Sequence, residues 1–568
     1  MAWRIGLGVG AAVPATSERA GATPNRLHVF GPNYMNPSVS VMSDRLTAYT
    51  LTGIAAIVAA YVLVILGTSK YGLGMNTDTA AYFSAATNLV EGRGLVQYNG
   101  GSYVYYAPLY PVLLAIPVAL GAEIGEAARH LHAATFALTV LLAVLWIRRL
   151  AAAQSLAVLG VLAVLLALPF FHTWTVVFSE AVFIPLIVAS LWGLATYLSD
   201  DSQRALWLAT ACAMLACLSR FAGLPLLMAG SAIILLAGRP SIRRRVVDAA
   251  LFSIVGSLPT ALWVLRNLAV SATTTGARFD EPSTFPDTLY RLLETLGSWF
   301  ILPRAPEMVR VAVGVGLIGL MGWTLIASVR SAVSRSLDAR RDVDGRRGTL
   351  LVTSGFVCVY VLFLAWAVSS KWTPSDPSRL LAPILVPLVV GGVVLADAAA
   401  ARLKTVAVPA IQFVPALVLV LLLAWPVRGV AGSIRYARQH GAGHYSSDAW
   451  QRSPLLRHVR ASPPVRRLYS NDHNGLHLLA RIDSVFPLPS FGVPGTPATP
   501  HEALQDFAAE VARDTSIVVV LFTERALDEL SYTRTDLESV FELRELSRHA
   551  DGAIYTLRHR GGVAAHGP

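Results

Sequence analysis

The sequence predicts an all-α polytopic membrane protein of about eleven transmembrane helices, followed by a small extracytoplasmic α/β domain at the C-terminal end. Three observations lead to this prediction. Hydrophobic residues make up 54% of the 568 residues and charged residues only 14%, against roughly 25% charged in soluble domains. Apolar runs of bilayer-spanning length recur along most of the chain. The last 139 residues are about 22% charged and the first 429 about 12%, which places the water-soluble part at the C-terminal end.

Composition also excludes several classes of protein. A chain this apolar cannot be a string of soluble domains or an intrinsically disordered protein. Three cysteines, all inside apolar runs, are too few for a disulfide-stapled scaffold. The net charge of +11 would suggest a nucleic-acid partner in a soluble protein. Here we interpret the arginines as loop charges that orient membrane helices and favour anionic lipids, and we expect no nucleic-acid partner.

Both chain ends are predicted to be disordered. Residues 1–45 are rich in Ala, Gly, Pro and Ser without helical periodicity, and residues 559–568 are of low complexity. The N-terminal segment lacks the apolar core of a signal peptide. Met42, directly before the first apolar run, is a candidate translation start.

Spanning helices need roughly 20 mainly apolar residues. By that standard we predict spans near 46–67, 128–147, 153–171, 181–198, 205–220, 221–238, 246–267, 310–330, 349–369, 380–398 and 405–427. The segment Pro108–Leu120 is shorter and contains three prolines, which favours an interfacial or re-entrant segment.

The basic residues orient these spans. Arginine-rich loops recur on one side only, after residues 147, 238, 330 and 398. The preference of basic loops for the cytoplasm then predicts a cytoplasmic N-terminus and a multi-pass protein of the plasma (inner) membrane. In this topology residues 46–427 form the membrane unit, with an external loop at 68–127. Residues 428–558 form the external α/β domain.

The external domain is expected from alternating strand and helix patterns. Strands are predicted at Arg466–Ser470, Ile482–Pro487, Ser516–Phe522, Val540–Leu546 and Ala553–Leu557, with a helix at 501–513. His473 and His477 share a short stretch of this domain; we interpret them as solvated surface rather than as metal ligands, because Gly475 weakens a helix between them.

The first external loop holds the main candidate for chemistry. Residues 79–91 predict a short helix that Gly92 ends, and Asp78 precedes it. The simplest interpretation makes Asp78 the N-cap of that helix. An exposed carboxylate at this place can also meet a lipid-borne substrate. The five tyrosines between 98 and 110 are typical of an interfacial aromatic belt, although aromatic faces also stack on sugar rings.

Several short motifs in the membrane unit carry a family resemblance. They are Asp78 before a helix, Glu91-Gly-Arg-Gly94, Tyr106-Ala-Pro-Leu-Tyr-Pro111, Ser179-Glu180, Leu218-Ser-Arg-Phe-Ala-Gly223, Trp263-Val-Leu-Arg-Asn267 and Ser378-Arg-Leu-Leu-Ala-Pro383. Their order and sidedness resemble the GT-C superfamily of polytopic glycosyltransferases, which use polyprenyl-phosphate sugars and include protein O-mannosyltransferases and the aminoarabinose transferase. Leu380 replaces the aromatic residue usual in the last motif. The resemblance covers most of residues 46–400.

This resemblance implies an inverting transfer of a sugar from a polyprenyl-phosphate donor to a hydroxyl of a cell-envelope acceptor at the external face. Asp78 would be the general base. The lipid phosphate would be bound by arginines at external helix ends: Arg266 first, then Arg379 and Arg220. The residues expected to position the acceptor, or a divalent metal with Asp78, are Glu180, Tyr82 and Tyr106. A divalent metal is the one cofactor that the resemblance leaves open.

Two other functions fit the same architecture. A secondary transporter or lipid flippase is compatible with eleven spans, but such proteins tend to have repeats and midplane charges, whereas the distinctive polar residues here gather at one face. A non-catalytic envelope assembly factor with the same fold is the other alternative.

Overall fold

The computed structural model describes residues 37–238, 241–276, 283–301, 304–334, 345–370, 377–403, 414–463, 467–491, 496–514, 516–523 and 532–560. The described residues from Tyr49 onward belong to one compact unit. The predicted disorder at 1–36 and 561–568 lies outside the described residues.

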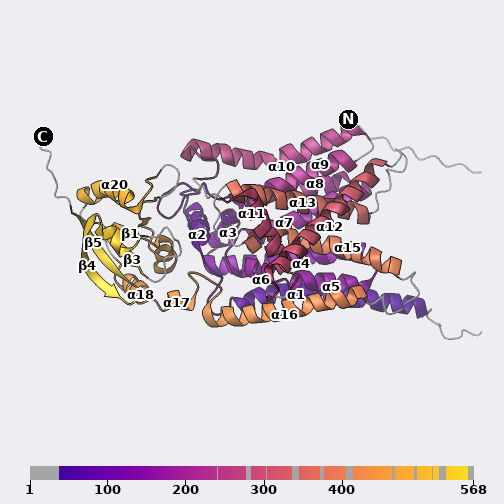
Figure 1. The fold of residues 1–568 in the computed structure, drawn as a ribbon, viewed down its shortest axis with the longest axis horizontal. Helices are drawn as coiled ribbons and strands as arrows, with labels where there is room; N and C mark the ends of the chain where they lie inside the picture. Colours follow the sequence, from indigo (N-terminus) through magenta and orange to yellow (C-terminus); the bar gives the residue numbers. More distant parts are fainter. Residues whose placement is uncertain are drawn as a thin grey trace, which may run out of the picture. The chain divides into compact units, whose positions relative to one another are not determined.

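Long helices packed alongside one another dominate this unit, to which α1 belongs from Tyr49 onward (Figure 1). The long helices are α1 (Pro37–Gly67), α4 (Ile124–Leu150), α7 (Glu180–Asp200), α10 (Ile242–Ser271), α12 (Glu307–Ser334), α13 (Gly345–Ser370), α15 (Leu385–Leu403) and α16 (Val414–His440). The shorter ones are α2 (Thr77–Val90), α3 (Leu109–Ala119), α5 (Gln154–Leu165), α6 (Leu168–Thr175), α8 (Gln203–Ser219), α9 (Leu224–Ala237), α11 (Phe285–Ser298) and α14 (Pro377–Leu381), with 3₁₀ turns η1 (Phe221–Gly223) and η3 (Ala382–Ile384).

The predicted polytopic helical class is confirmed. Within the part of the chain that the structure describes, seven helices are long and apolar enough to cross a membrane. An eighth arises if α5 and α6 form one span, bent by 42°. The predicted run 153–171 is therefore broken rather than continuous. The runs at 205–220 and 221–238 form the shorter helices α8 and α9, and the start of 405–427 lies outside the described residues. The count of eleven stays a prediction.

The proline-rich segment after the first external loop forms α3, a helix of 11 residues. At 1.5 Å per residue it is too short to cross the hydrocarbon core. This agrees with the predicted interfacial or re-entrant segment. Its residues Tyr110 and Leu114 are fully buried, so α3 belongs to the helical core.

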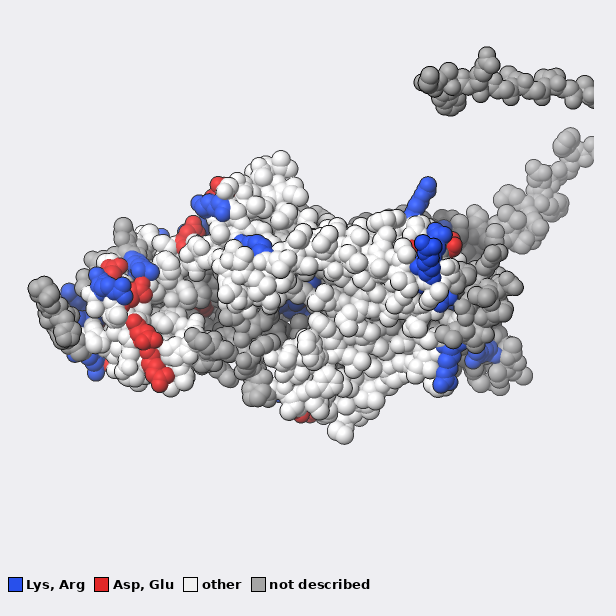
Figure 2. All heavy atoms as spheres, turned by 90° about the horizontal axis from the view of Figure 1, so that it is seen from above, with Lys and Arg blue, Asp and Glu red and all other residues white. Residues whose placement is uncertain are grey.

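Charged groups mark one end of the helical bundle. Arg149 at the end of α4 pairs with Asp200 at the end of α7. Arg346 at the start of α13 pairs with Asp397 of α15 at 2.8 Å and donates to the carbonyl of Leu150. The face in Figure 2 shows few charged side chains over its middle. The basic helix ends therefore meet at one end of the bundle, as the loop pattern predicts, while Glu180 begins α7 at the other end.

The C-terminal segment contains one five-stranded sheet, ordered β2-β1-β3-β5-β4. Its strands are β1 (Leu468–Ser470), β2 (Val485–Pro487), β3 (Val518–Phe522), β4 (Phe541–His549) and β5 (Gly552–His559), each at or near a predicted strand. β1 runs parallel to β2 and β3, whereas β5 is antiparallel to β3 and β4. Helix α20 (Pro500–Arg513) buries Leu504 and Phe507 in the sheet's core. β5 ends at His559, one residue inside the segment predicted to be disordered.

Short helices complete this region: α17 (Asp448–Gln451), α18 (Pro454–Ala461), α19 (His473–Gly475), the π-helical turn η5 (Leu476–Ala480) and α21 (Arg534–Glu538). The interpretation of His473 and His477 as solvated surface is wrong, because both are partly buried against Tyr98 of the first external loop. The His477 ring stacks on Tyr98 with centroids 3.9 Å apart, and the Tyr98 hydroxyl donates to Asn474 at 3.0 Å. These contacts join the loop to the C-terminal segment.

Candidate active site

A short extended segment, residues 73–76, leads into helix α2 and is held on both sides. On one side, Gly74 donates to the carbonyl of Thr175 at 2.8 Å and accepts from Val177 at 2.8 Å. On the other side, Met75 accepts from the backbone of Tyr445 at 3.0 Å. Gly74 permits this close approach, since a Cβ at this position would lie 2.7 Å from the carbonyl oxygen of Ala442. Three distant parts of the sequence therefore meet directly before Asp78.

Asn76, and not Asp78, is the N-cap of helix α2. The Asn76 side chain accepts from the Thr79 backbone N–H at 3.1 Å, and the Thr79 hydroxyl accepts from the Asn76 N–H at 2.9 Å, which completes a capping box. The predicted capping role of Asp78 is wrong for this reason. Asp78 lies in the first turn of α2, so its carboxylate is not engaged in capping and remains available to other side chains.

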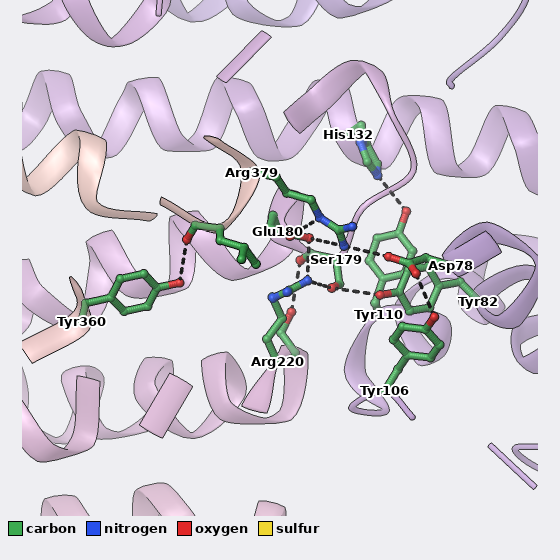
Figure 3. A network of polar contacts seen from close by, with 12 residues as sticks. Asp78, Tyr82, Tyr106, Tyr110, His132, Ser179, Glu180, Arg220, Tyr360 and Arg379 are labelled. Carbon is green, nitrogen blue, oxygen red and sulfur yellow. Dashed lines mark hydrogen bonds and ion pairs between the residues drawn. The ribbon is translucent and has the colours of Figure 1, made fainter. Parts of the chain in front are cut away.

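The Asp78 carboxylate has two side-chain partners (Figure 3). One oxygen accepts from the Tyr106 hydroxyl at 2.8 Å, and the other from the Arg379 guanidinium at 2.8 Å. Its side chain is 17% exposed, so that it lies near the surface of a largely buried cluster. Residues 300 positions apart in the sequence are thus brought into direct contact.

Glu180 lies between the two arginines at the first residue of α7, and only 1% of it is exposed. Arg379 pairs with both Glu180 oxygens, and Arg220 at the end of α8 pairs with one of them at 2.7 Å. A charge this deeply buried needs such partners, because burial of an unpaired carboxylate is costly. Arg379 also lies over the Phe178 ring, with its guanidinium carbon 3.7 Å from the centroid.

The tyrosines around Asp78 are mostly part of the core, so the interpretation as an interfacial belt is wrong for Tyr103 and Tyr110, both buried. Tyr82 contacts the rings of Tyr106 and Tyr110 edge to face, at 5.0 and 4.8 Å. The Tyr82 hydroxyl donates to Ser179 at 3.1 Å, and Ser179 in turn accepts from Arg220 at 3.1 Å. Tyr82, Tyr106 and Tyr110 therefore form a cluster of rings, the aromatic wall, that connects Asp78 with the two arginines.

Arg266 is the predicted phosphate ligand that the structure does not bring into this network. Its guanidinium donates to the carbonyl of Tyr103 at 2.8 Å and lies over Trp263 at 4.7 Å. The Trp263 indole donates to the carbonyl of Tyr106 at 3.3 Å, and Asn267 donates to that of Val104 at 3.3 Å. The Trp-x-x-Arg-Asn motif therefore holds the backbone of residues 103–106, the tyrosine segment.

The network contains two carboxylates and two guanidinium groups, so its formal charges cancel. Burial on its own would raise the pKa of the Asp78 carboxyl, but Arg379, the Tyr106 hydroxyl and the more distant Arg220 outweigh it, and the pKa lies below the usual aspartate value. Asp78 is therefore ionised at neutral pH and can accept a proton. The arginines supply a fork of N–H donors suited to a phosphate.

Some members of the network were not predicted from the sequence. Ser179 connects Tyr82 with Arg220, and the Tyr110 hydroxyl is 2.7 Å from Nε2 of the buried His132. Ser179 belongs to the Ser179-Glu180 motif, which could have indicated its role. His132 is a lone histidine in an apolar run, and nothing in the sequence pattern indicated its contact with Tyr110. In the part of the chain that the structure describes, no three His, Cys, Asp or Glu residues come together as metal ligands. Arg379 lies between Asp78 and Glu180, where a bridging metal would need to be.

A separate cavity of about 450 Å³ lies between α6 and α16. It is lined by residues including His172, Arg428, Tyr436 and Gly441, and not by Asp78 or Arg379. It therefore lies outside the polar network.

Comparisons with solved structures identify the fold. ArnT from Cupriavidus metallidurans in the apo state aligns with a TM-score of 0.57 at 12% identity, covering 90% of this chain and 98% of that one. The structure of the same protein bound to undecaprenyl phosphate aligns with a TM-score of 0.55 at 12% identity, covering 89% and 97%. The mycobacterial arabinofuranosyltransferase AftD is also similar, with a TM-score of 0.45 at 14% identity, covering 89% and 40%.

Sequence comparison adds no relative: no protein-family model matches the chain, and no curated protein matches it by sequence. The fold of ArnT nevertheless extends over nine tenths of the chain and nearly the whole of that protein. The predicted resemblance is confirmed at the level of the fold, because this chain has a fold similar to that of ArnT.

Proposed function

We propose that the protein is an inverting glycosyltransferase that moves a sugar from a polyprenyl-phosphate donor to a hydroxyl acceptor at the external membrane face. The observation that supports this most is the contact of Asp78 with Arg379, which joins a candidate base to a candidate phosphate ligand. It occurs in a fold shared with ArnT, one structure of which is bound to undecaprenyl phosphate. The external domain and the cell-envelope acceptor are part of the proposal.

In the proposed reaction Asp78 takes the proton of the acceptor hydroxyl as that oxygen attacks the anomeric carbon. The bond from this carbon to the phosphate oxygen breaks, and its electron pair leaves with the polyprenyl phosphate. A single displacement inverts the anomeric configuration. General-base help of this kind is worth roughly 10²–10⁴-fold.

Arg379 and Arg220 would bind the lipid phosphate, whose negative charge grows as the bond breaks. Cationic N–H donors stabilise such charge without acting as strong acids. A phosphate that takes over Arg379 also removes the guanidinium that lowers the pKa of Asp78. Donor binding would therefore make Asp78 a stronger base at the moment when one is needed.

The remaining candidates take supporting roles. Glu180 holds the two arginines beside each other, and Tyr106 orients Asp78. Tyr82 positions the acceptor side through the aromatic wall. We assign Arg266 to positioning of the tyrosine segment rather than to the phosphate, because its guanidinium already donates to the carbonyl of Tyr103.

The test is turnover of purified protein in detergent or nanodiscs with polyprenyl-phosphate mannose, arabinose and glucose. We expect consumption of one donor, with a product whose anomeric configuration is opposite to that of the donor. Retained configuration would contradict the single displacement. Donor consumption by none of the three, together with movement of labelled polyprenyl phosphate across proteoliposomes, would favour a flippase instead.

A further inference from the structure

His444 has a left-handed backbone conformation that is not part of a helix cap. Among the described residues other than glycine, four have positive φ: Asp201, Ala272, His444 and Arg481. The other three are the left-handed C-caps of helical segments, a usual place for this conformation. His444, with φ of 41°, follows a loop and caps no helix. Left-handed backbone outside caps is costly and clusters at functional sites.

The loop that carries His444 is fixed in place. His444 pairs with Met75 in a parallel bridge. The Ser446 hydroxyl donates to the carbonyl of Leu73 at 2.5 Å, and the Tyr71 hydroxyl donates to that of Gln439 at 3.2 Å. The loop consists of residues 441–447. The Ser446 bond attaches the loop itself, and the Tyr71 bond attaches the end of α16 before it, to the segment that leads into α2. The conformation of His444 is therefore imposed by its neighbours.

This attachment brings the loop of His444 and the residues before Glu180 to opposite edges of the extended segment 73–76. That segment bonds residues 175–177 through Gly74, and the loop of His444 through Met75. Asp78 follows the segment by two residues, and its carboxylate is close enough to raise the pKa of His444. Arg379 joins Asp78 to Glu180, which begins α7 three residues after Val177.

The chemistry of the ring suits an uncharged hydroxyl. His444 reaches solvent, and its imidazole has no hydrogen-bond partner within the described part of the chain. Desolvation of the part of the ring that packs against the protein lowers the pKa of His444, and the Asp78 carboxylate opposes this only in part. The ring is therefore mainly neutral at pH 7, with one N–H donor and one nitrogen acceptor. A neutral ring is a poor phosphate ligand but a good partner for a hydroxyl.

We propose that His444 is a substrate-contacting residue that hydrogen-bonds a carbohydrate hydroxyl next to Asp78. The inference rests on the proposed glycosyl transfer and adds a residue from the C-terminal segment to its site. The hydroxyl belongs either to the sugar of the donor or to the acceptor, since both lie beside the base during transfer. The strain at His444 then serves to present the ring to the substrate.

The test uses the full-length protein with His444→Gly, which accepts the backbone conformation and removes the ring, and His444→Asn, which tolerates it and keeps hydrogen-bonding groups. His440→Gly is the matched control, because His440 is an exposed histidine four residues earlier that stacks on Tyr436. The probes are decaprenyl phosphate and its mannose, arabinose and glucose derivatives. Binding is measured for each, and donor turnover for the sugars.

For His444→Gly we expect about a tenfold loss either in binding of the sugar-bearing probe or in donor turnover, which is the size of effect expected from one hydrogen bond. Weaker binding of the sugar-bearing probe, with unchanged binding of decaprenyl phosphate, assigns the contact to the donor sugar. Unchanged binding of both with reduced turnover assigns it to the acceptor. His444→Asn should stay within about threefold of wild type, and His444→Gly should not melt at a lower temperature, since it relieves strain.

The inference would be overturned if His444→Gly matched wild type in both probe binding and donor turnover. It would also be overturned if His444→Asn lost as much as His444→Gly. If Asp78→Asn abolishes turnover while His444→Gly does not change it, the proposed function stands and the inference fails. If Asp78→Asn keeps turnover and His444→Gly weakens binding, the assigned base fails and the contact stands. A wild type that neither binds nor consumes any donor overturns both.

Discussion

The two ends of the helical bundle use the same residue types in different ways. At the end marked by α4, α7, α13 and α15, two ion pairs join helix ends: Arg149 with Asp200, and Arg346 with Asp397. Asp397 also accepts from the backbone N–H groups of Ala152 and Ala153, so that its lone pairs are used within the protein. These are structural pairs that fasten helix ends.

At the opposite end the charges are shared rather than paired. Arg379 contacts both Asp78 and Glu180, and Glu180 also contacts Arg220. Within the described part of the chain, neither guanidinium donates to a backbone carbonyl, and a phosphate can replace a carboxylate as their partner. Exchangeable charge, rather than buried charge as such, therefore distinguishes a site for chemistry from a pair that only joins helix ends.

The largest expected effect comes from Arg379→Gln. Loss of the shared guanidinium should lower donor turnover by about 10²–10³-fold, as for loss of one transition-state donor. The same exchange at the other end, Arg346→Gln, should lower the melting temperature but keep turnover per folded molecule within about twofold, since it is remote from the reaction. Equal turnover loss in both variants, measured on monodisperse protein, would show that the two ends do not differ in role.

Tyr106→Phe should have the next largest effect. The change removes the hydroxyl that donates to Asp78 and leaves the ring in place. A hydrogen bond to a charged group is worth roughly 1.5–3 kcal/mol, so we expect about a tenfold loss of turnover with unchanged affinity for decaprenyl phosphate. Tyr105→Phe, on an exposed neighbouring side chain, is the control. A loss of affinity for decaprenyl phosphate instead would indicate that Tyr106 contacts the phosphate rather than orients Asp78.

The pH dependence of turnover follows from the lowered pKa of Asp78. A base whose pKa is lowered stays ionised until the pH falls below the ordinary aspartate range of about 4. Its contribution to stability is likewise present above that range and is lost as pH falls through the lowered value. The value of kcat/KM, which reports the free enzyme, should therefore show no acid decline from Asp78 between about pH 8 and 5. In Tyr106→Phe this decline should move to higher pH. In His444→Gly, which lacks the neighbouring imidazole, a decline of kcat/KM near pH 6 would contradict Asp78 as the base.

The smallest effect is expected from Asn76→Ala, which removes the cap of α2. Loss of an N-cap costs about 1 kcal/mol of stability. Ser202→Ala removes the corresponding cap of α8 at the other end and should cost a similar amount. Only Asn76→Ala should also lower turnover, by about threefold, because the cap fixes the turn that carries Asp78. Thermal melting and turnover on the same samples distinguish the two.

The sequence predicted much of the fold and part of the site. Apolar runs and basic loops located the long helices, and the alternating tail pattern located the strands, because both signals are local. Asp78, Glu180, Arg220 and Arg379 were predicted from the order of short motifs. Their contacts were not, since residues 78 and 379 meet only through the packing of the whole bundle.

Two residues show where local patterns are insufficient. Asp78 has the residue type and place of an N-cap, but the better-placed Asn76 forms a reciprocal pair with Thr79. Arg266 has the residue type and helix end of a phosphate ligand, and its binding of the phosphate stays a prediction. Its guanidinium already donates to backbone carbonyls of a segment more than 150 residues earlier, which the sequence pattern does not show.

The proposed role of Asp78 as the base is tested most directly by donor turnover of Asp78→Asn beside Asp200→Asn, the same change at the other end of α7. We expect at least a ~10²-fold loss for Asp78→Asn. Turnover of Asp200→Asn should stay within about twofold of wild type, because its surface ion pair contributes little. Equal turnover in Asp78→Asn and wild type would contradict this role.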